Sequence, residues 1–303
     1  RRALSLRSPL TARGAAPAAR GVAPFDGPSA MPASARGFAL LAALPLAIFA
    51  LAFLLAPLAR LVLASGEGAA GWALYAEVLA NPRYLASLRD TVLVSAATTL
   101  AALAIAGTAA LFLARHRFPG RSALVALLTF PLAFPGVVVG FMIILLGGRQ
   151  GLLNWASRAL FEERLVLAYS MTGLFLGYLY FSIPRVLLTV MAAAEKLDPA
   201  LEEAARSLGA GPWRVLRDVT LPAVAPALVA SGAVAFATAM GAFGTAFTLA
   251  TDIDVLPMVV YTEFTLMANV ATAAALSVIL GLVTWALLLV ARSFAGATVA
   301  AGG

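Results

Sequence analysis

The chain has 303 residues, of which 62% are apolar and only 12% are charged, whereas about a quarter of the residues in a soluble globular domain are charged. This shortage of charge excludes an ordinary soluble protein. Cysteine is absent and there is one histidine, which excludes disulfides, thiolate metal sites and a cysteine nucleophile. We therefore expect neither a catalytic residue nor a metal site.

The first segment, residues 1–36, is basic and differs in composition from the rest. It is rich in arginine, alanine, proline and glycine and contains a single acid, Asp26. Such a segment buries too little apolar surface to offset its ordering entropy, so we expect a disordered tail. Because the first methionine is Met31, we expect translation to start there and residues 1–30 to be an upstream extension. The alternative is an organelle transit peptide, which is also rich in arginine and poor in acids.

Six charge-free apolar runs follow, and each reaches the length of about 20 residues that crosses a bilayer core as a helix. These runs predict an all-α integral membrane protein with six transmembrane helices, in which residues 37–295 form the membrane domain and residues 296–303 a short C-terminal tail. Lysine and arginine concentrate in the tail and in alternate loops, most clearly at Arg115, Arg117 and Arg121, so the positive-inside rule predicts that both termini are cytoplasmic. The runs cover residues 37–59, 91–114, 122–148, 165–184, 219–251 and 264–291.

Proline and glycine interrupt several of these runs. The third contains Pro131, Pro135 and Gly136, and a membrane tolerates such breaks only where protein or water satisfies the freed carbonyl groups. This cluster favours a helix that lines a translocation pathway, with ordinary kinking as the alternative. The fifth run is rich in small residues, including Gly241 and Gly244, which is typical of a packed helix interface; a dimer seam or a translocation surface is the alternative.

One charge, Arg185, lies well inside an apolar stretch. Intramembrane charges generally have a function. Only nine residues separate Arg185 from Glu195, however, and a long side chain can extend along apolar surface to reach water. We therefore expect Arg185 to snorkel toward the cytoplasmic interface, with a functional role as the alternative.

The segment between the fourth and fifth runs, residues 195–222, is expected to form two short helices joined by a turn. Asp198 is a suitable N-cap for the first helix, and Glu202 and Arg206 are spaced to pair on its polar face. Gly209 can supply the left-handed residue that ends it. The apolar face is small and rich in alanine, so we expect it to dock into a protein groove rather than to rest on the membrane surface.

This segment also carries a motif. The pattern EAA, three residues, G, nine residues, I, one residue, LP is matched except that valine replaces isoleucine. In this motif, and in its place before the last two runs, the chain resembles the inner-membrane permease of type I ABC importers, nearest to the branch for polyamines, ferric iron, sulfate and phosphonate. The resemblance covers about residues 38–295. The matching residues are Glu203, Ala204, Ala205, Gly209, Val219, Leu221 and Pro222.

The resemblance implies the MetI-like permease fold in a multi-pass protein of the bacterial inner membrane. It implies that the two short helices couple to a cytoplasmic ABC ATPase dimer, while a second permease subunit, identical or different, and an external substrate-binding protein complete the importer. Glu195 stands where a phosphate-binding loop needs glycine before its lysine, Lys196, so ATP is expected in the partner and no cofactor in this chain. No nucleic-acid partner is expected. The implied coupling residues are Glu203, Ala204, Ala205, Gly209, Leu221 and Pro222.

The acids near the fifth run bear on the solute. Asp252, Asp254 and Glu263 have no basic residue among them in the sequence, and a negative rim would concentrate cations. This favours a polyamine such as spermidine or putrescine over ferric iron, sulfate or phosphonate, although solvated acids or a docking rim for the binding protein would give the same pattern.

Two other classes of protein remain as alternatives. An ion-coupled secondary transporter usually has intramembrane acids, and the six runs contain none. An intramembrane hydrolase would need a motif such as HExxH or GxSxG. The one histidine, His116, instead lies between two arginines in a loop, where an exposed basic turn is the simpler interpretation.

Overall fold

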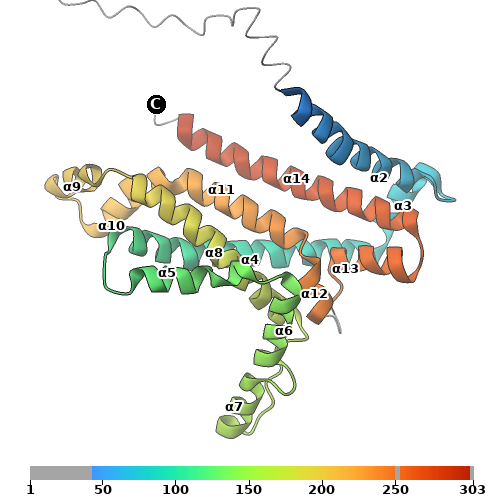
Figure 1. The fold of residues 1–303 in the computed structure, drawn as a ribbon, viewed down its shortest axis with the longest axis horizontal. Coiled ribbons are helices and arrows are strands. Elements are labelled where there is room, and N and C mark those ends of the chain that lie inside the picture. Colours follow the sequence, from blue (N-terminus) through green and yellow to red (C-terminus); the bar gives the residue numbers. More distant parts are fainter. Residues whose placement is uncertain (1–42, 250–252, 301–303) are drawn as a thin grey trace, which may run out of the picture. The chain divides into compact units, whose positions relative to one another are not determined.

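The computed structural model describes residues 43–249 and 253–300, and every regular element in this part of the chain is helical. The segments are shown in Figure 1. The prediction of an all-α membrane protein with six spans is confirmed for these residues, whereas the predicted disordered tail lies outside them. Six helical segments are long and apolar enough to cross a membrane: Ala43–Gly66, Pro82–Arg115, Gly136–Phe161, Met171–Lys196, Pro212–Met240 and Val270–Ala291.

The chain divides into two units, Arg1–Leu55 and Ala56–Gly303. The described part of the first unit is helical and ends in a π-helical turn, Leu51–Leu55. Its large apolar side chains are exposed, among them Leu46 and Phe53, which is typical of a helix whose surroundings are lipid or another protein rather than water.

The centre of the second unit is formed by helices α4 (Pro82–Arg115), α8 (Met171–Lys196) and α11 (Leu221–Met240), which pack against one another. Helix α4 starts at Pro82, whose missing N–H costs nothing at a first helical position, and the Asn81 side chain caps it by accepting from the Arg83 amide. Small residues bring the backbones close, as is usual between helices in lipid. Three fully buried alanines of α4 pack with Val186, Leu187 and Val190 of α8: Ala102, Ala106 and Ala110.

Helix α14 (Val270–Ala300) packs against α11, against α2 (Ala56–Gly66) and against the short helices α3 (Leu74–Ala80) and α13 (Leu256–Tyr261). A separate apolar core joins α3, α13 and α14. Most of the expected C-terminal tail is the end of α14. The remaining helices are α5 (Arg121–Thr129), α6 (Gly136–Gly147), α7 (Leu152–Phe161), α9 (Pro199–Ser207), α10 (Pro212–Val215) and α12 (Phe243–Leu249).

Two of the predicted spans are broken. The first break agrees with the interruption expected at Pro131, Pro135 and Gly136, whereas the second corrects the expectation of one continuous run 219–251. Run 122–148 divides into α5, a 3-10 turn at Phe130–Ala133 and α6, because Pro135 has no N–H and keeps the residue before it out of the helical region. Run 219–251 divides at Gly241, between α11 and α12.

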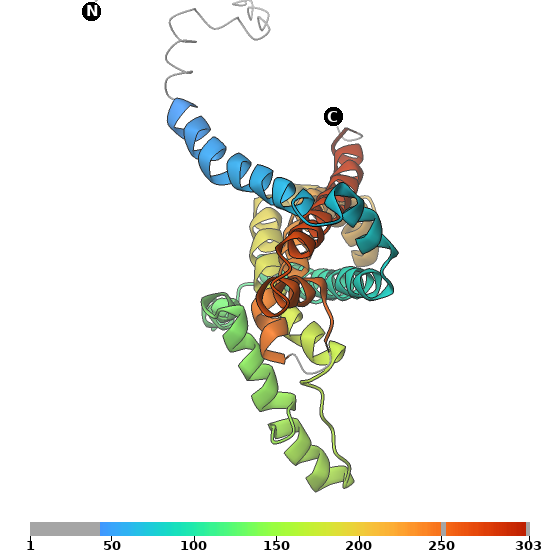
Figure 2. The ribbon, with the colours of Figure 1, turned by 90° about the vertical axis from the view of Figure 1, so that its right-hand side faces the viewer.

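The two breaks lie together, since α6 packs against α12. The Thr245 hydroxyl donates to the Gly136 carbonyl over 2.9 Å. A Cβ atom at Gly140 would come within 2.6 Å of the Thr248 side chain, so glycine is required for this close approach. Figures 1 and 2 show α6 and α7 extending away from the helices α4, α8 and α11.

Candidate functional site

The first candidate site is the hairpin formed by α9 and α10, residues 197–215. The Asp198 carboxylate caps α9 by accepting from the Ala200 amide over 2.9 Å, and Gly209 turns the chain with a φ of 84°. The predicted cap, turn and two helices are therefore confirmed. One detail differs, because α10 runs through a π-helical turn, Leu216–Thr220, directly into α11.

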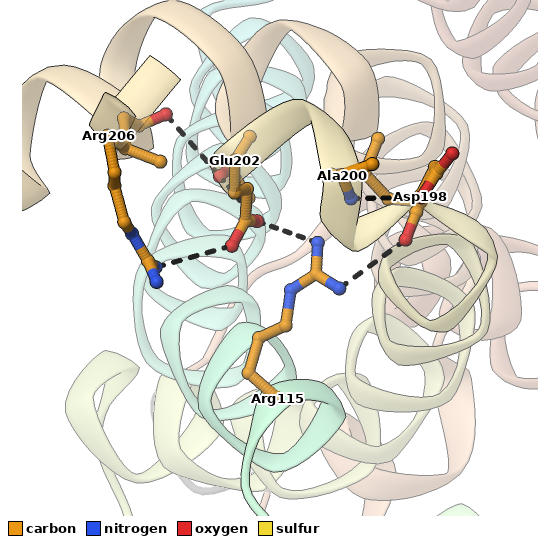
Figure 3. Close-up of polar contacts among 8 residues, drawn as sticks. Arg115, Asp198, Ala200, Glu202 and Arg206 are labelled. Atoms are coloured by element: carbon orange, nitrogen blue, oxygen red, sulfur yellow. Dashed lines mark hydrogen bonds and ion pairs between the residues drawn. The ribbon is translucent and has the colours of Figure 1, made fainter. Parts of the chain in front are cut away.

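A charged network fixes this hairpin to the membrane helices (Figure 3). At the end of α4, Arg115 donates to the Glu202 carboxylate over 2.6 Å and to the Leu197 carbonyl over 3.4 Å. The same carboxylate accepts from the Thr220 hydroxyl over 3.0 Å and pairs with Arg206 at 3.6 Å, so the predicted Glu202–Arg206 pair is confirmed. The Glu202 side chain is only 12% exposed, and such a sheltered, hydrogen-bonded pair is less screened than a surface pair.

A second pair lies beside this network. Arg121, the first residue of α5, donates to the Glu195 carboxylate over 2.6 Å and to the Leu113 carbonyl over 2.7 Å. The sequence pattern indicates only that Arg115 and Arg121 orient the chain in the membrane. Their role as anchors of residues 195–220 was missed, and the only signal for it was opposite charge in two separate loops.

The outer face of the hairpin is apolar and exposed. Leu208 is 89% exposed, and Leu201 and Trp213 are also largely exposed. Of the expected coupling residues, Glu203 and Ala204 are exposed on α9 and Ala205 is half-buried. The structure thus brings Glu203, Ala204, Ala205 and Gly209 together in one arm and its turn, whereas Leu221 and Pro222 lie on the first turn of α11.

The second candidate site is a cavity of about 290 Å³ at the two helix breaks. Four of the five expected pathway residues line it, and the fifth, Pro135, is the N-cap of α6 next to it. The cavity is also lined by side chains of α8 and by two threonines of α11 and α12. The pathway residues at the cavity are Pro131, Gly136, Gly241 and Gly244, and the other polar side chains are those of Arg185, Thr238 and Thr245.

Arg185 does not snorkel, which corrects the expectation from the sequence. Its Nη1 atom donates to the Phe181 carbonyl over 2.7 Å, and its guanidinium lies 5.3 Å from the centre of the Phe181 ring. Phe181 precedes Arg185 by one helical turn, so the side chain points toward the start of α8 and away from Lys196. The hydrogen bond to the Phe181 carbonyl and the cation–π contact with its ring hold the side chain at the cavity.

The acidic rim expected near the fifth run is also corrected. Asp254 pairs with Arg83 at 3.4 Å, so a basic residue does oppose it. Glu263 is only 8% exposed and accepts from the Tyr84 hydroxyl over 3.0 Å, while Asp252 lies outside the described residues. The described part of the chain also holds no group of three His, Cys, Asp or Glu residues that could bind a metal ion.

Comparisons with known proteins agree with this geometry. A family model for the binding-protein-dependent transport system inner membrane component matches residues 103–299. The sulfate transport system permease protein CysT of Escherichia coli (strain K12) is 34% identical over 207 residues, which are 68% of this chain and 73% of that protein. The molybdenum transport system permease protein ModB of the same organism is 33% identical over 189 residues, or 61% of this chain and 81% of that protein.

The fold also matches a solved structure, that of a bacterial alginate ABC transporter in complex with an alginate pentasaccharide-bound periplasmic protein. The TM-score is 0.72 and the sequence identity is 19%, over 85% of this chain and 93% of that chain. At this identity the likeness concerns the fold alone.

Proposed function

Because this chain belongs to the family of binding-protein-dependent transport system inner membrane components, that is, the ABC importer permeases, we propose that it carries a small tetrahedral oxyanion, of the sulfate or molybdate kind, across the inner membrane. It is a multi-pass membrane protein that transports a small solute. ATP is hydrolysed by a separate cytoplasmic ATPase dimer, and an external binding protein delivers the solute to a pair of permease subunits, identical or different.

The observation that carries the coupling proposal is the α9–α10 hairpin, residues 197–215. It presents an apolar face in which Leu208 is 89% exposed, while its polar face is fixed to α4 by the Arg115–Glu202 pair at 2.6 Å. Burial of such a face against a partner is favourable in proportion to the apolar area removed from water. The ATPase is the partner that we assign to it, with Glu203, Ala204 and Ala205 at the contact and Gly209 at the turn.

The solute class is supported by two independent observations. Relatives covered over 73–84% of their own length are named for sulfate, molybdenum and 2-aminoethylphosphonate, and the sulfate, molybdate and phosphonate groups are all tetrahedral oxyanions. A polyamine is no longer favoured, because Asp254 is paired with Arg83 and Glu263 is buried and bonded to the Tyr84 hydroxyl. Two of the three acids expected to attract a cation are thus engaged by neighbouring side chains.

The test is uptake by proteoliposomes that contain the permease with its ATPase and binding protein. We expect ATP-dependent uptake of [35S]sulfate or [99Mo]molybdate and no uptake of [14C]spermidine, with vesicles that lack ATP as the control. Uptake of spermidine without either oxyanion would contradict the solute class. Uptake that continues without ATP would instead favour an ion-coupled secondary transporter.

A further inference from the structure

Arg185 is a charged residue in the middle of a membrane-spanning helix. Placing a guanidinium at this depth is costly, and intramembrane arginines are therefore usually paired or face a polar pathway. In the part of the chain that the structure describes, Arg185 makes no ion pair, and no acid lines the cavity of about 290 Å³ that it faces. The positive charge of the cavity is thus left uncompensated by these residues.

The Arg185 side chain is held in place, but most of its N–H groups are not used in hydrogen bonds to the described residues. One of its five N–H donors is used by the Phe181 carbonyl at 2.7 Å, and the ring of Phe181 lies beneath the guanidinium. Within the described residues, the other donors have no protein acceptor. A guanidinium matches the planar pairs of oxygen atoms of an oxyanion, to which it can donate two parallel hydrogen bonds.

The start of α6 adds to the positive potential at the same cavity. The helix begins at Gly136, after Pro135, and has twelve residues, so its first amide groups have no intrahelical acceptor and its dipole points a partial positive charge toward the break. Gly136 and Val137 both line the cavity. A Cβ atom at Gly244 would lie 3.1 Å from the Val137 nitrogen, so glycine at this position avoids a side chain over the amide end of α6.

We propose that Arg185 and the amide end of α6 form an anion-binding station in the translocation pathway, at which an oxyanion released by the binding protein is held briefly while it crosses. The inference rests on the proposed function and adds to it the place where the permease itself recognises the solute. It explains why an arginine is kept facing a cavity lined by the glycines of two helix breaks. A cation such as a polyamine is repelled at the same place.

The test uses the reconstituted importer with [35S]sulfate as the probe. Arg185→Gln removes the charge but keeps an amide N–H that can still donate to the Phe181 carbonyl. The variant therefore distinguishes a role in binding the anion from a role in capping that carbonyl. For Arg185→Gln we expect kcat for uptake to fall at least tenfold. KM should stay nearly unchanged, because the binding protein governs it. For Arg185→Lys we expect a smaller fall in kcat. The matched control is Arg158→Gln, which removes one positive charge from an exposed position on α7 and is expected to transport at the wild-type rate.

A second pair of variants leaves Arg185 in place, in case its replacement prevents membrane insertion. Thr238 lines the same cavity, so Thr238→Glu supplies an internal carboxylate that competes with the solute for Arg185. We expect a much larger loss of uptake than for Thr238→Gln, which has the same size and no charge.

Three outcomes would overturn the station or the function behind it. If Arg185→Gln takes up sulfate at the same rate as Arg158→Gln, the anion-binding station is contradicted and the proposed function stays intact. Equal uptake by Thr238→Glu and Thr238→Gln would lead to the same conclusion. A wild-type importer that takes up neither sulfate nor molybdate would overturn the proposed solute class and the station together.

Discussion

Gly209 and Gly211 sit two residues apart in the turn between α9 and α10, yet their backbones differ. Gly209 has a φ of 84°, and the next amide, that of Ala210, donates back to the Ala205 carbonyl over 3.0 Å, as in other helix ends that close through a left-handed glycine. Gly211 has a φ of −70°, which any residue adopts. A Cβ atom would meet nothing within 4 Å at either position, so only the backbone conformation distinguishes them.

This difference predicts the effect of alanine at each position. Gly209→Ala should lower the free energy of unfolding by about 1–2 kcal/mol, the cost of a left-handed backbone for a residue with a Cβ atom, and should weaken ATP-driven uptake. Gly211→Ala should be neutral or slightly stabilising, because it only restricts the unfolded chain. Thermal unfolding of the purified protein measures both, and equal melting temperatures for the two variants would contradict the assigned role of Gly209.

At this scale the sequence predicts what depends on near neighbours. The Asp198 cap, the Glu202–Arg206 pair and the Gly209 turn each involve residues within one helical turn, and all three are confirmed. The Arg115–Glu202 and Arg121–Glu195 pairs join residues 87 and 74 positions apart. These two pairs depend on how α4 meets α9 and how α5 meets α8, which no local spacing encodes.

Helix α9 is an element with two unlike faces. Glu202 fixes one face to α4 and α11 through Arg115 and Thr220, whereas Leu201 and Leu208 lie exposed on another. Because the exposed leucines are seven residues apart, they lie on the same side of the helix. The element therefore offers a rigidly mounted apolar contact surface.

A charge placed on this surface should weaken binding of the ATPase. We expect Leu208→Asp to lower the affinity of the detergent-solubilised permease for its ATPase at least tenfold, or about 1.4 kcal/mol, because a buried contact residue is lost and a carboxylate must be desolvated. Melting temperature should stay unchanged. The control is Leu165→Asp, an equal change at an exposed leucine between α7 and α8; a similar loss of ATPase binding in both variants would contradict the assignment of α9.

Hydropathy predicted the long helices better than their breaks. Runs 122–148 and 219–251 are free of charged residues throughout, so hydropathy does not mark the ends of α5 and α11, although Pro131, Pro135 and Gly136 predict an interruption in the first run. The breaks arise at Pro135, which cannot donate to a preceding turn, and at Gly241. They are stabilised by the packing of α6 on α12, which is a tertiary contact.

On the scale of the whole molecule, the orientation in the membrane rests on loop charges alone. The structure gives six apolar helices, and the positive-inside rule, applied to the basic loops, predicts that both termini are cytoplasmic. The same orientation puts the α9–α10 hairpin on the cytoplasmic side, where an ATPase can reach it, and α7 on the outside.

The absence of native cysteine allows a clean test of this topology. We expect Ala159→Cys, at an exposed position on α7, to react with a membrane-impermeant maleimide in intact spheroplasts. Ser207→Cys, exposed at the end of α9, should react only after the membrane is permeabilised. The reverse labelling pattern would place the hairpin outside the cell and would contradict its coupling role.

The network around Glu202 has a mechanical consequence. Since one carboxylate bonds both Arg115 at the end of α4 and Thr220 at the entrance to α11, a displacement of α9 is transmitted to two membrane helices at once and little of it is absorbed by bending of the hairpin. The helix breaks before Gly136 and at Gly241 are then the places where the molecule bends most easily, because the continuous helical hydrogen bonds stop there. We therefore expect a displacement of α9 to deform the chain first at the cavity lined by Arg185.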